Sequence, residues 1–348
     1  MSRKLPCRGG SILLGIKNRS PLEAALIPWV GADGHEAAVL IVKGTFDIRD
    51  AGGPLRLSET QVPIHRSDSY RGDAAASSLT AASESCSTKS GTDVVLLGHA
   101  CSMTGPVKVL DVELRVGTLR KVVRAFGDRV WFKLLGTWQM SNPVPFERMP
   151  LIYERAFGGM DSAANVQDRR NPVGTGFAAR RSDGRLDGLA LPNLEDPQNL
   201  IRQWDSRPAP VGFGFIAPQW EPRCGYAGTY DQLWRQERFP LLPQDFDERF
   251  YNAASQGLIA RPHLRGGESV QVLGASRGGP LAFALPGLRP DISVKLRGRR
   301  AQHAPVLDTV VINTDERWVT LSWKVTVPCP RAFLYLEEVA VSCRTGGN

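Results

Sequence analysis

The sequence has no uninterrupted apolar run of about 18 residues, the length at which a membrane-spanning helix becomes a candidate. Its N-terminus starts with basic residues but offers only a short apolar patch, Ile12 to Ile16, with Lys17 and Arg19 close behind. A secretory signal needs a longer apolar stretch than this one. We therefore expect neither a membrane segment nor a secretory leader, and a cytoplasmic location.

Cysteine and histidine are scarce. Six cysteines are spread over 348 residues without a CxxC pair, which excludes the dense disulfide framework of small secreted domains. His99 and Cys101 alternate as neighbours on one strand face would, but two ligands do not make a zinc site. The five histidines stand in unrelated contexts. We predict free thiols, no metal and no cofactor.

Recognisable enzyme motifs are also missing. The sequence has no GxxxxGK[ST] and no HExxH, and its GTGF and GFGF strings lack the strand-to-helix setting of a dinucleotide cradle. The string GASRG, residues 274–278, fits the G-x-S-x-G pattern that presents a nucleophilic serine. However, Pro280 and a second β-type run follow where that motif requires a helix. We predict a hairpin turn here, and no nucleophilic role for Ser276.

Glycine and proline are abundant, with 35 and 25 residues, which favours short strands joined by frequent turns. Strand-like runs bounded by turn residues dominate the first 140 residues and return after Gly267. Residues 320–327 alternate cleanly between apolar and polar, which is typical of an antiparallel sheet packed on one side. We predict a mainly β (α+β) protein with antiparallel, sandwich-like sheets.

The middle of the chain has a different pattern. Residues 146–267 combine glycine, proline and aromatic residues with few helix signals, so we expect an irregular insert. We divide the chain into an N-terminal β-rich region (1–145), this segment with short helices (146–267), and a C-terminal β-rich region (268–348) that packs with the first. Three helix starts are indicated, at Asp196 with Pro197, at Thr229 with Gln232, and at Asp245 with Glu248.

A polar stretch between Ser58 and Thr92 is rich in serine, alanine, threonine and aspartate, with almost no apolar period. This composition predicts a long, mobile loop or a loosely ordered crossing.

The net charge is +8, which suits an acidic partner. The densest basic run, residues 294–300, alternates apolar and basic residues as a strand with a solvated face does. No RNA-binding string, helix-turn-helix pattern or zinc finger accompanies the charge. We therefore expect protein partners, and neither nucleic acid nor membrane.

Many spaced strings of the sequence resemble the bacterial domain-of-unknown-function 2169 family, which is linked to type VI secretion systems. Those that carry the resemblance are MPLIYERAFGGMD (149–161), NPVGTGF (171–177), LPNLEDP (191–197), PAPVGFGFIAPQWEPR (208–223), GTYDQLW (228–234) and FPLLPQDFDERFYNAA (239–254). The resemblance implies a cytoplasmic adaptor or chaperone whose partners are a toxin effector and the secreted spike protein. It transfers no catalytic residue.

An adaptor needs a rigid scaffold that presents aromatic and arginine contacts, because tryptophan, tyrosine and arginine supply most hot spots at protein interfaces. The candidate partner-binding residues are Arg155, Asp161, Trp204, Trp220, Arg223, Tyr230, Trp234, Arg235 and Arg238.

Two alternatives remain open. One is a carbohydrate- or peptidoglycan-active enzyme that uses a pair of middle carboxylates as acid and base, drawn from Glu154, Asp161, Asp183, Asp187, Glu195, Asp205, Asp231, Asp245 and Asp247. The other is a structural component of the secretion apparatus that is itself secreted with the spike.

Overall fold

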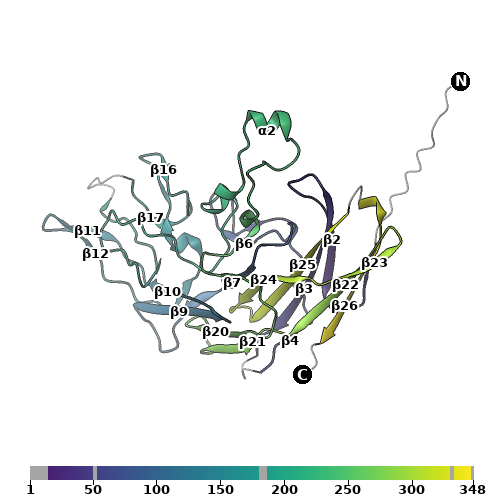
Figure 1. Ribbon diagram of the computed structural model, residues 1–348. Coiled ribbons are helices and arrows are strands. Elements are labelled where there is room, and N and C mark those ends of the chain that lie inside the picture. Colours follow the sequence, from purple (N-terminus) through teal and green to yellow (C-terminus); the bar gives the residue numbers. More distant parts are fainter. Residues whose placement is uncertain (1–14, 50–52, 180–185, 330–332, 346–348) are drawn as a thin grey trace.

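The computed structural model describes residues 15–49, 53–179, 186–329 and 333–345. Its largest sheet has seven strands in the order β19-β7-β24-β25-β3-β2, with β4 paired to β3 (Figure 1). Strands β7 and β24 run parallel, and the other neighbours are antiparallel. The strands are β2 (Glu23–Val30), β3 (Glu36–Asp47), β4 (Arg56–Leu57), β7 (Thr92–Leu97), β19 (Ile259–Ala260), β24 (Val306–Asn313) and β25 (Trp318–Pro328).

Two further sheets flank this one. The five-stranded sheet has the order β18-β10-β9-β20-β21, with β9 (Val109–Val116), β10 (Leu119–Phe126), β18 (Leu194–Glu195), β20 (Ser269–Leu273) and β21 (Leu281–Ala284). The four-stranded sheet has the order β1-β26-β22-β23, with β1 (Ile16–Asn18), β22 (Leu288–Leu296), β23 (Arg299–His303) and β26 (Leu336–Thr345). Early and late strands pair in the larger sheets, β3 with β25 and β9 with β20.

Short strand pairs and helical turns complete the described chain. The pairs are β5 (Ser69–Tyr70) with β6 (Leu79–Ala81), β8 (His99–Cys101) with β13 (Arg148–Pro150), β11 (Trp131–Leu134) with β12 (Thr137–Met140), β14 (Phe157–Gly158) with β17 (Thr175–Gly176), and β15 (Met160–Asp161) with β16 (Val166–Gln167). The helices are α2 (Gln232–Glu237) and the 3-10 turns η1 (Tyr153–Arg155), η2 (Arg223–Tyr226), η3 (Glu248–Tyr251) and η4 (Phe333–Tyr335).

One large hydrophobic core joins the three sheets, with Val42, Val94, Leu114, Val272 and Val339 among its buried members. Strand β3 is buried at every position between its two end residues, which matches its nearly continuous apolar sequence. Strand β20 instead alternates exposed and buried positions, as a strand with one solvated face does. The prediction of a mainly β protein with antiparallel sheets is confirmed.

The GASRG string forms a hairpin connection, as predicted, because β20 and β21 pair directly across it. Ser276 is buried, and its Oγ accepts a hydrogen bond from the amide of Gly278 at 3.3 Å.

The helix predicted from Asp196 is wrong. Leu194 and Glu195 form strand β18, and the next residues form a turn in which the Asp196 carboxylate accepts from the amide of Gln198 at 2.9 Å. Such a side-chain contact competes with helix formation. The buried Glu195 carboxylate also accepts a hydrogen bond from the amide of Ile201 at 2.7 Å.

The prediction of a loosely ordered crossing between residues 58 and 92 is also wrong. This stretch contains β5 and β6, and several of its polar side chains are buried, including Ser78, Glu84 and Lys89. The amide and hydroxyl of Ser78 both donate to the Glu154 carboxylate at 2.8 Å. The stretch lacks an apolar period because polar contacts hold much of it in place.

Candidate functional site

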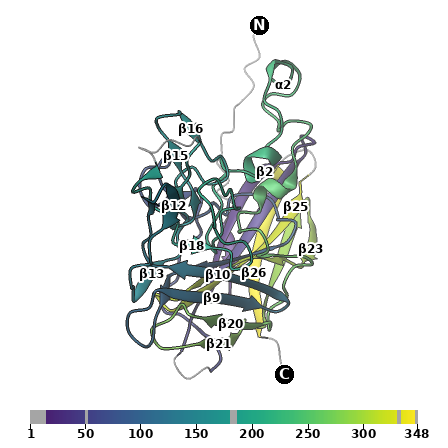
Figure 2. The same ribbon diagram turned by 90° about the vertical axis from the view of Figure 1, so that its left-hand side faces the viewer.

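An arm that carries helix α2 projects from the body of the protein, and both views show it standing clear of the sheets (Figures 1 and 2). We call residues 229–242 the α2 arm. At its base, the amide and hydroxyl of Thr229 donate to the Asp245 carboxylate at 2.9 and 2.7 Å. This contact joins the first residue of the arm to the segment that follows the arm.

The helix caps therefore lie two residues beyond the positions predicted at Thr229 and Asp245. Asp231 caps α2, because its carboxylate accepts from the amide of Trp234 at 2.8 Å. Asp247 caps η3 in the same way through the amide of Arg249.

The aromatic rings of the arm pack edge to face against one another, and much of their surface stays exposed. The Trp234 ring meets Tyr230 and Phe239 edge to face, with centroid separations of 4.7 and 5.7 Å. Its indole N–H donates to the carbonyl of Leu241 at 2.8 Å. Tyr230, Leu233 and Phe239 are 48%, 58% and 69% exposed. The arm is thus a preorganised apolar surface.

The two predicted arginines of the arm differ in role. Arg238 donates to the carbonyl of Ala32 at 2.6 Å and to that of Leu242 at 3.0 Å, so it holds the arm against the β2–β3 turn. Arg235 is exposed, and its side chain makes no hydrogen bond or ion pair with the part of the chain that the structure describes.

Three predicted partner contacts lie inside the protein. Trp220 is 1% exposed and meets the Tyr153 ring edge to face at 5.6 Å. Arg223 is 8% exposed and donates to the carbonyls of Phe250 and Ile216, each at 2.8 Å. Asp161, also buried, accepts from backbone amides. These side chains hold the fold, in place of the surface contact that we predicted.

The other two predicted residues are partly exposed. Arg155 donates to Asn193 at 3.0 Å and lies 3.4 Å from the Asp128 carboxylate. Trp204 packs on a small separate hydrophobic cluster that includes Trp131 and Phe157. Neither residue belongs to the α2 arm.

The structure contains a cavity of about 650 Å³ that the sequence did not reveal. Five cationic side chains from separate segments line it: Lys121, Arg170, Arg223, Arg249 and Arg261. The acids that line it are Asp196 and Glu221, neither of which belongs to the carboxylates predicted as an acid–base pair. Of that predicted set, Asp183 lies outside the described residues. Only Arg223 among the predicted site residues reaches this cavity.

Lys121 projects from β10 into the cavity wall. Its amine donates to the hydroxyl of Ser255 at 2.5 Å and to the carbonyl of Gln256 at 2.9 Å. Burial lowers the pKa of Lys121 from 10.5 to about 8, although the charge of Asp196 acts in the opposite direction. The folded protein thus holds this ammonium ion at a cost in stability.

We expect Lys121→Met to stabilise the protein at pH 7 by about 1–3 kcal/mol, since the pKa shift sets the upper end and the two lost hydrogen bonds reduce it. Between pH 8 and 10.5 the unfolded wild-type chain binds more protons than the folded protein, so wild-type stability rises with pH and the gap closes. Urea denaturation from pH 7 to 10 measures this. Lys108→Met, at an exposed lysine, is the control. Parallel pH profiles for wild type and Lys121→Met would contradict the assignment.

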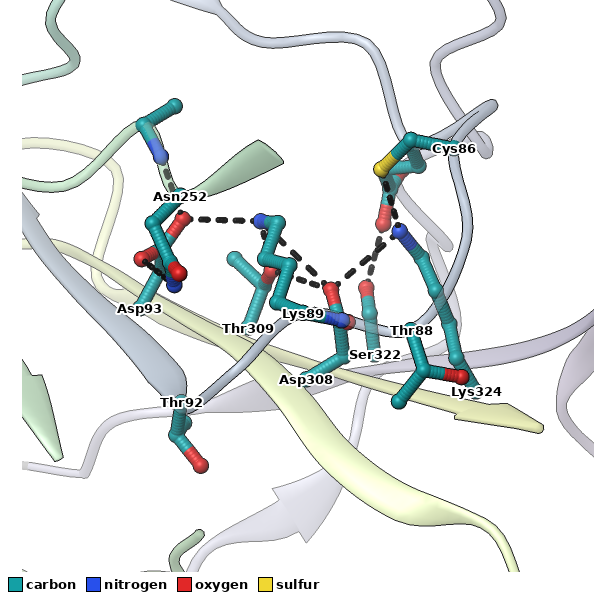
Figure 3. A network of polar contacts seen from close by, with 12 residues as sticks. Cys86, Thr88, Lys89, Thr92, Asp93, Asn252, Asp308, Thr309, Ser322 and Lys324 are labelled. Carbon is teal, nitrogen blue, oxygen red and sulfur yellow. Dashed lines mark hydrogen bonds and ion pairs between the residues drawn. The ribbon is translucent and has the colours of Figure 1, made fainter. Parts of the chain in front are cut away.

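Beside the cavity, two lysines and two aspartates form a buried, charge-balanced network (Figure 3). The Lys89 amine lies 2.8 Å from Asp93 and 3.4 Å from Asp308, and the Lys324 amine lies 3.2 Å from Asp308. Asn252 connects this network to the cavity, because its amide donates to Asp93 at 2.9 Å and it also lines the cavity.

Ion pairing outweighs burial in setting the pKa values of Lys89 and Asp308. Burial alone would lower the pKa of the Lys89 amine, but Asp93 and Asp308 raise it above its ordinary value. Burial alone would raise the pKa of Asp308, but Lys324 and Lys89 hold it below. The amines therefore stay protonated and are not nucleophiles.

A second buried pair lies close by on the same sheet. The Lys43 amine contacts the Glu84 carboxylate at 2.8 Å, and Glu84 also accepts from the hydroxyl of Ser322. Lys43 completes its contacts with the carbonyl of Pro63 at 2.9 Å. The Lys43–Glu84 pair and the ion pairs of Lys89 anchor the 58–92 stretch to the seven-stranded sheet.

Within the described ranges, no helix has both the length and the apolar composition needed to cross a bilayer. The same residues gather no group of three histidine, cysteine, aspartate or glutamate side chains that could hold a metal ion. The comparison with curated proteins gives no match, and neither does the comparison with solved structures. The family described as "Uncharacterized protein conserved in bacteria (DUF2169)" matches residues 33–324, so the chain belongs to the DUF2169 family, as its sequence strings predicted.

Proposed function

We propose that the chain is an adaptor or chaperone of a type VI secretion system, which binds a toxin effector and helps to load it onto the spike protein. The observation that supports this best is the α2 arm, where a short helix presents apolar side chains to solvent instead of to the core. Single exposed apolar residues are ordinary, but a cluster on a projecting element is typical of an interaction site.

The arm also suits binding energetically. The edge-to-face ring contacts, the Asp231 cap and the Thr229–Asp245 contact fix its shape before any partner arrives. Binding then loses less conformational entropy than it would with a flexible segment. Tyrosine and arginine are enriched among hot-spot residues, and the arm offers Tyr230 and Arg235 at its surface.

The carbohydrate-active enzyme has weaker support. None of the predicted carboxylates that the structure describes lines the cavity, and several make internal contacts instead, as Glu154 does with Ser78 and Glu195 with Arg129.

Substituting serine for Tyr230, Leu233 and Phe239 together tests the proposal. We expect the recovery of effector and spike with the tagged protein from its own bacterium to fall at least about tenfold, because the loss of one hot spot costs 2 kcal/mol or more. Mass spectrometry of the co-purified proteins gives the measurement.

The control variant carries serine at three apolar residues with comparable exposure away from the arm, Met103, Val144 and Met160. It should recover both partners as the wild type does, and both variants should keep the wild-type melting temperature. Equal recovery with the arm variant and the wild type would remove the arm from the interface. Recovery of neither partner by the wild type would count against the adaptor role itself.

A further inference from the structure

The cavity beside β10 combines a useful size with an unusual concentration of positive charge. Its volume of about 650 Å³ falls within the range of pockets that enclose small organic ligands. Two of its five cations are neutralised nearby, because Arg170 pairs with Asp168 and Arg249 with Asp247, each at 2.5 Å. The other three, Lys121, Arg223 and Arg261, have no carboxylate within 4.0 Å among the described residues.

Arg223 is the most informative of these cations. Its guanidinium is almost completely buried, yet its hydrogen-bond partners are two backbone carbonyls. A buried charge is normally paired, because taking an ion out of water without a counter-ion is unfavourable. Asp68 and Asp93 act on the charge of Arg223 only from beyond ion-pair distance, and its other neighbour is the Phe250 ring at 5.2 Å. A carboxylate or phosphate in the cavity would give this guanidinium a direct counter-ion.

The cavity wall holds a further unused polar group. Tyr153 is 2% exposed, and its hydroxyl makes no hydrogen bond of normal geometry within the described residues, although Ser255 lies near it. Burial raises the pKa of Tyr153 to about 12, so the hydroxyl keeps its proton and can donate. Its oxygen has almost no accessible surface, so Tyr153 shapes the cavity wall and does not itself reach a ligand.

The remaining lining suits the body of an organic molecule. Apolar side chains stand among the charged ones: Ala209, Pro210, Val211, Ile216, Pro222 and Ile259. Of the two acids, Glu221 forms an ion pair with Arg169 at 3.2 Å, so the charge of the wall is predominantly positive.

We propose that this cavity binds a small organic anion whose carboxylate or phosphate oxygens face Arg223, Arg261 and Lys121. Arginine favours this chemistry, because its planar guanidinium matches carboxylate and phosphate groups with two parallel hydrogen bonds. The Tyr153 ring forms part of the wall, and the apolar side chains contact the carbon skeleton. This site lies apart from the α2 arm, so it does not depend on the adaptor role.

Titration calorimetry of the full chain with citrate and with adenosine diphosphate tests the proposal and separates the two oxyanion types. We expect at least one probe to bind with a dissociation constant of about 1 mM or tighter and to raise the melting temperature. Arg261→Gln and Lys121→Met should each weaken that binding at least about tenfold. Lys121→Met folds more stably by the argument above, so lost binding in it cannot be ascribed to unfolding.

Arg277→Gln is the matched control, because it removes one charge from an exposed arginine outside the cavity. It should leave the affinity unchanged. Absence of binding by both probes at 10 mM would overturn the proposal. So would binding that all three variants weaken equally, because the anion would then be responding to the overall positive charge of the protein.

Discussion

Replacing Asp308 by alanine will lower the free energy of unfolding by about 3–5 kcal/mol, the cost of removing one partner from a buried ion pair. Asp308 is fully buried and is the only carboxylate within 4.0 Å of the Lys324 amine in the described structure. Without Asp308, that amine keeps the Cys86 sulfur at 3.2 Å, which is a weak acceptor. Lys89 retains Asp93, so most of the cost falls on Lys324 (Figure 3).

Urea denaturation followed by circular dichroism measures this loss, and two further variants identify its cause. Asp308→Asn keeps the side-chain size but leaves the positive charge unbalanced, so it should cost nearly as much as alanine. The double variant Asp308→Leu with Lys324→Met removes both charges, and we expect it to recover at least half of the lost stability. A loss of under about 1 kcal/mol in Asp308→Ala would show that the network contributes little.

Acid should reveal the same interaction in the unaltered protein. The pKa of Asp308 in the folded state lies below its ordinary value of 3.8, because Lys324 and Lys89 outweigh the effect of burial. Asp308 therefore stabilises the fold above pH 3.8, and this stabilisation is lost as pH falls through the folded pKa. Asp308→Asn should show a smaller decrease in stability across that acidic range than the wild type does.

Sequence reasoning succeeded where the structural signal is local. The strand over residues 320–327 and the hairpin at the GASRG string depend only on neighbouring residues, and both are present. The predicted packing on one side is wrong, because the polar face of this strand is also buried, with Lys324 0% exposed. A strand face or a hairpin turn is set within a few residues, so its pattern is visible before the strand's partner is known.

It failed where a side chain is used by a distant part of the chain. Thr229 has the residue type and spacing of a helix cap, but its hydroxyl donates to the Asp245 carboxylate. The helix is capped by Asp231 instead. Residues 58–92 read as a loose loop because polar side chains with buried partners look the same in sequence as solvated ones. Lys89 and Asp308 are 219 positions apart, so nothing local indicates their contact.

Of the two candidate sites, the α2 arm was visible in the sequence and the cavity was not. The α2 arm could be singled out because its aromatic residues lie in one short segment. The cavity could not, because five separated segments each contribute one cation. Residue type also does not separate surface from core, since Trp220 and Trp234 have the same chemistry but only Trp220 is buried in the large core.

Trp220→Ala should lower the free energy of unfolding by about 3–5 kcal/mol, the usual cost of truncating a buried aromatic side chain. The Trp220 ring is 1% exposed and supports the Tyr153 ring edge to face. Tyr153 is itself tightly held, because a methyl group added at Gly212 would lie only 3.0 Å from its ring. The lost indole volume therefore cannot be refilled without moving the cavity wall.

Trp234→Ala is the matched control, because it removes the same side chain from the α2 arm, where no helical residue is buried. It should cost about 1 kcal/mol, from one indole hydrogen bond and two exposed ring contacts. Chemical denaturation of both variants gives the comparison, and equal losses would mean that Trp220 is not the structural support that its burial indicates. Calorimetry with the anion that binds the wild type should then separate the two sites. Trp220→Ala weakens binding because Tyr153 loses its support, whereas Trp234→Ala leaves the cavity unchanged.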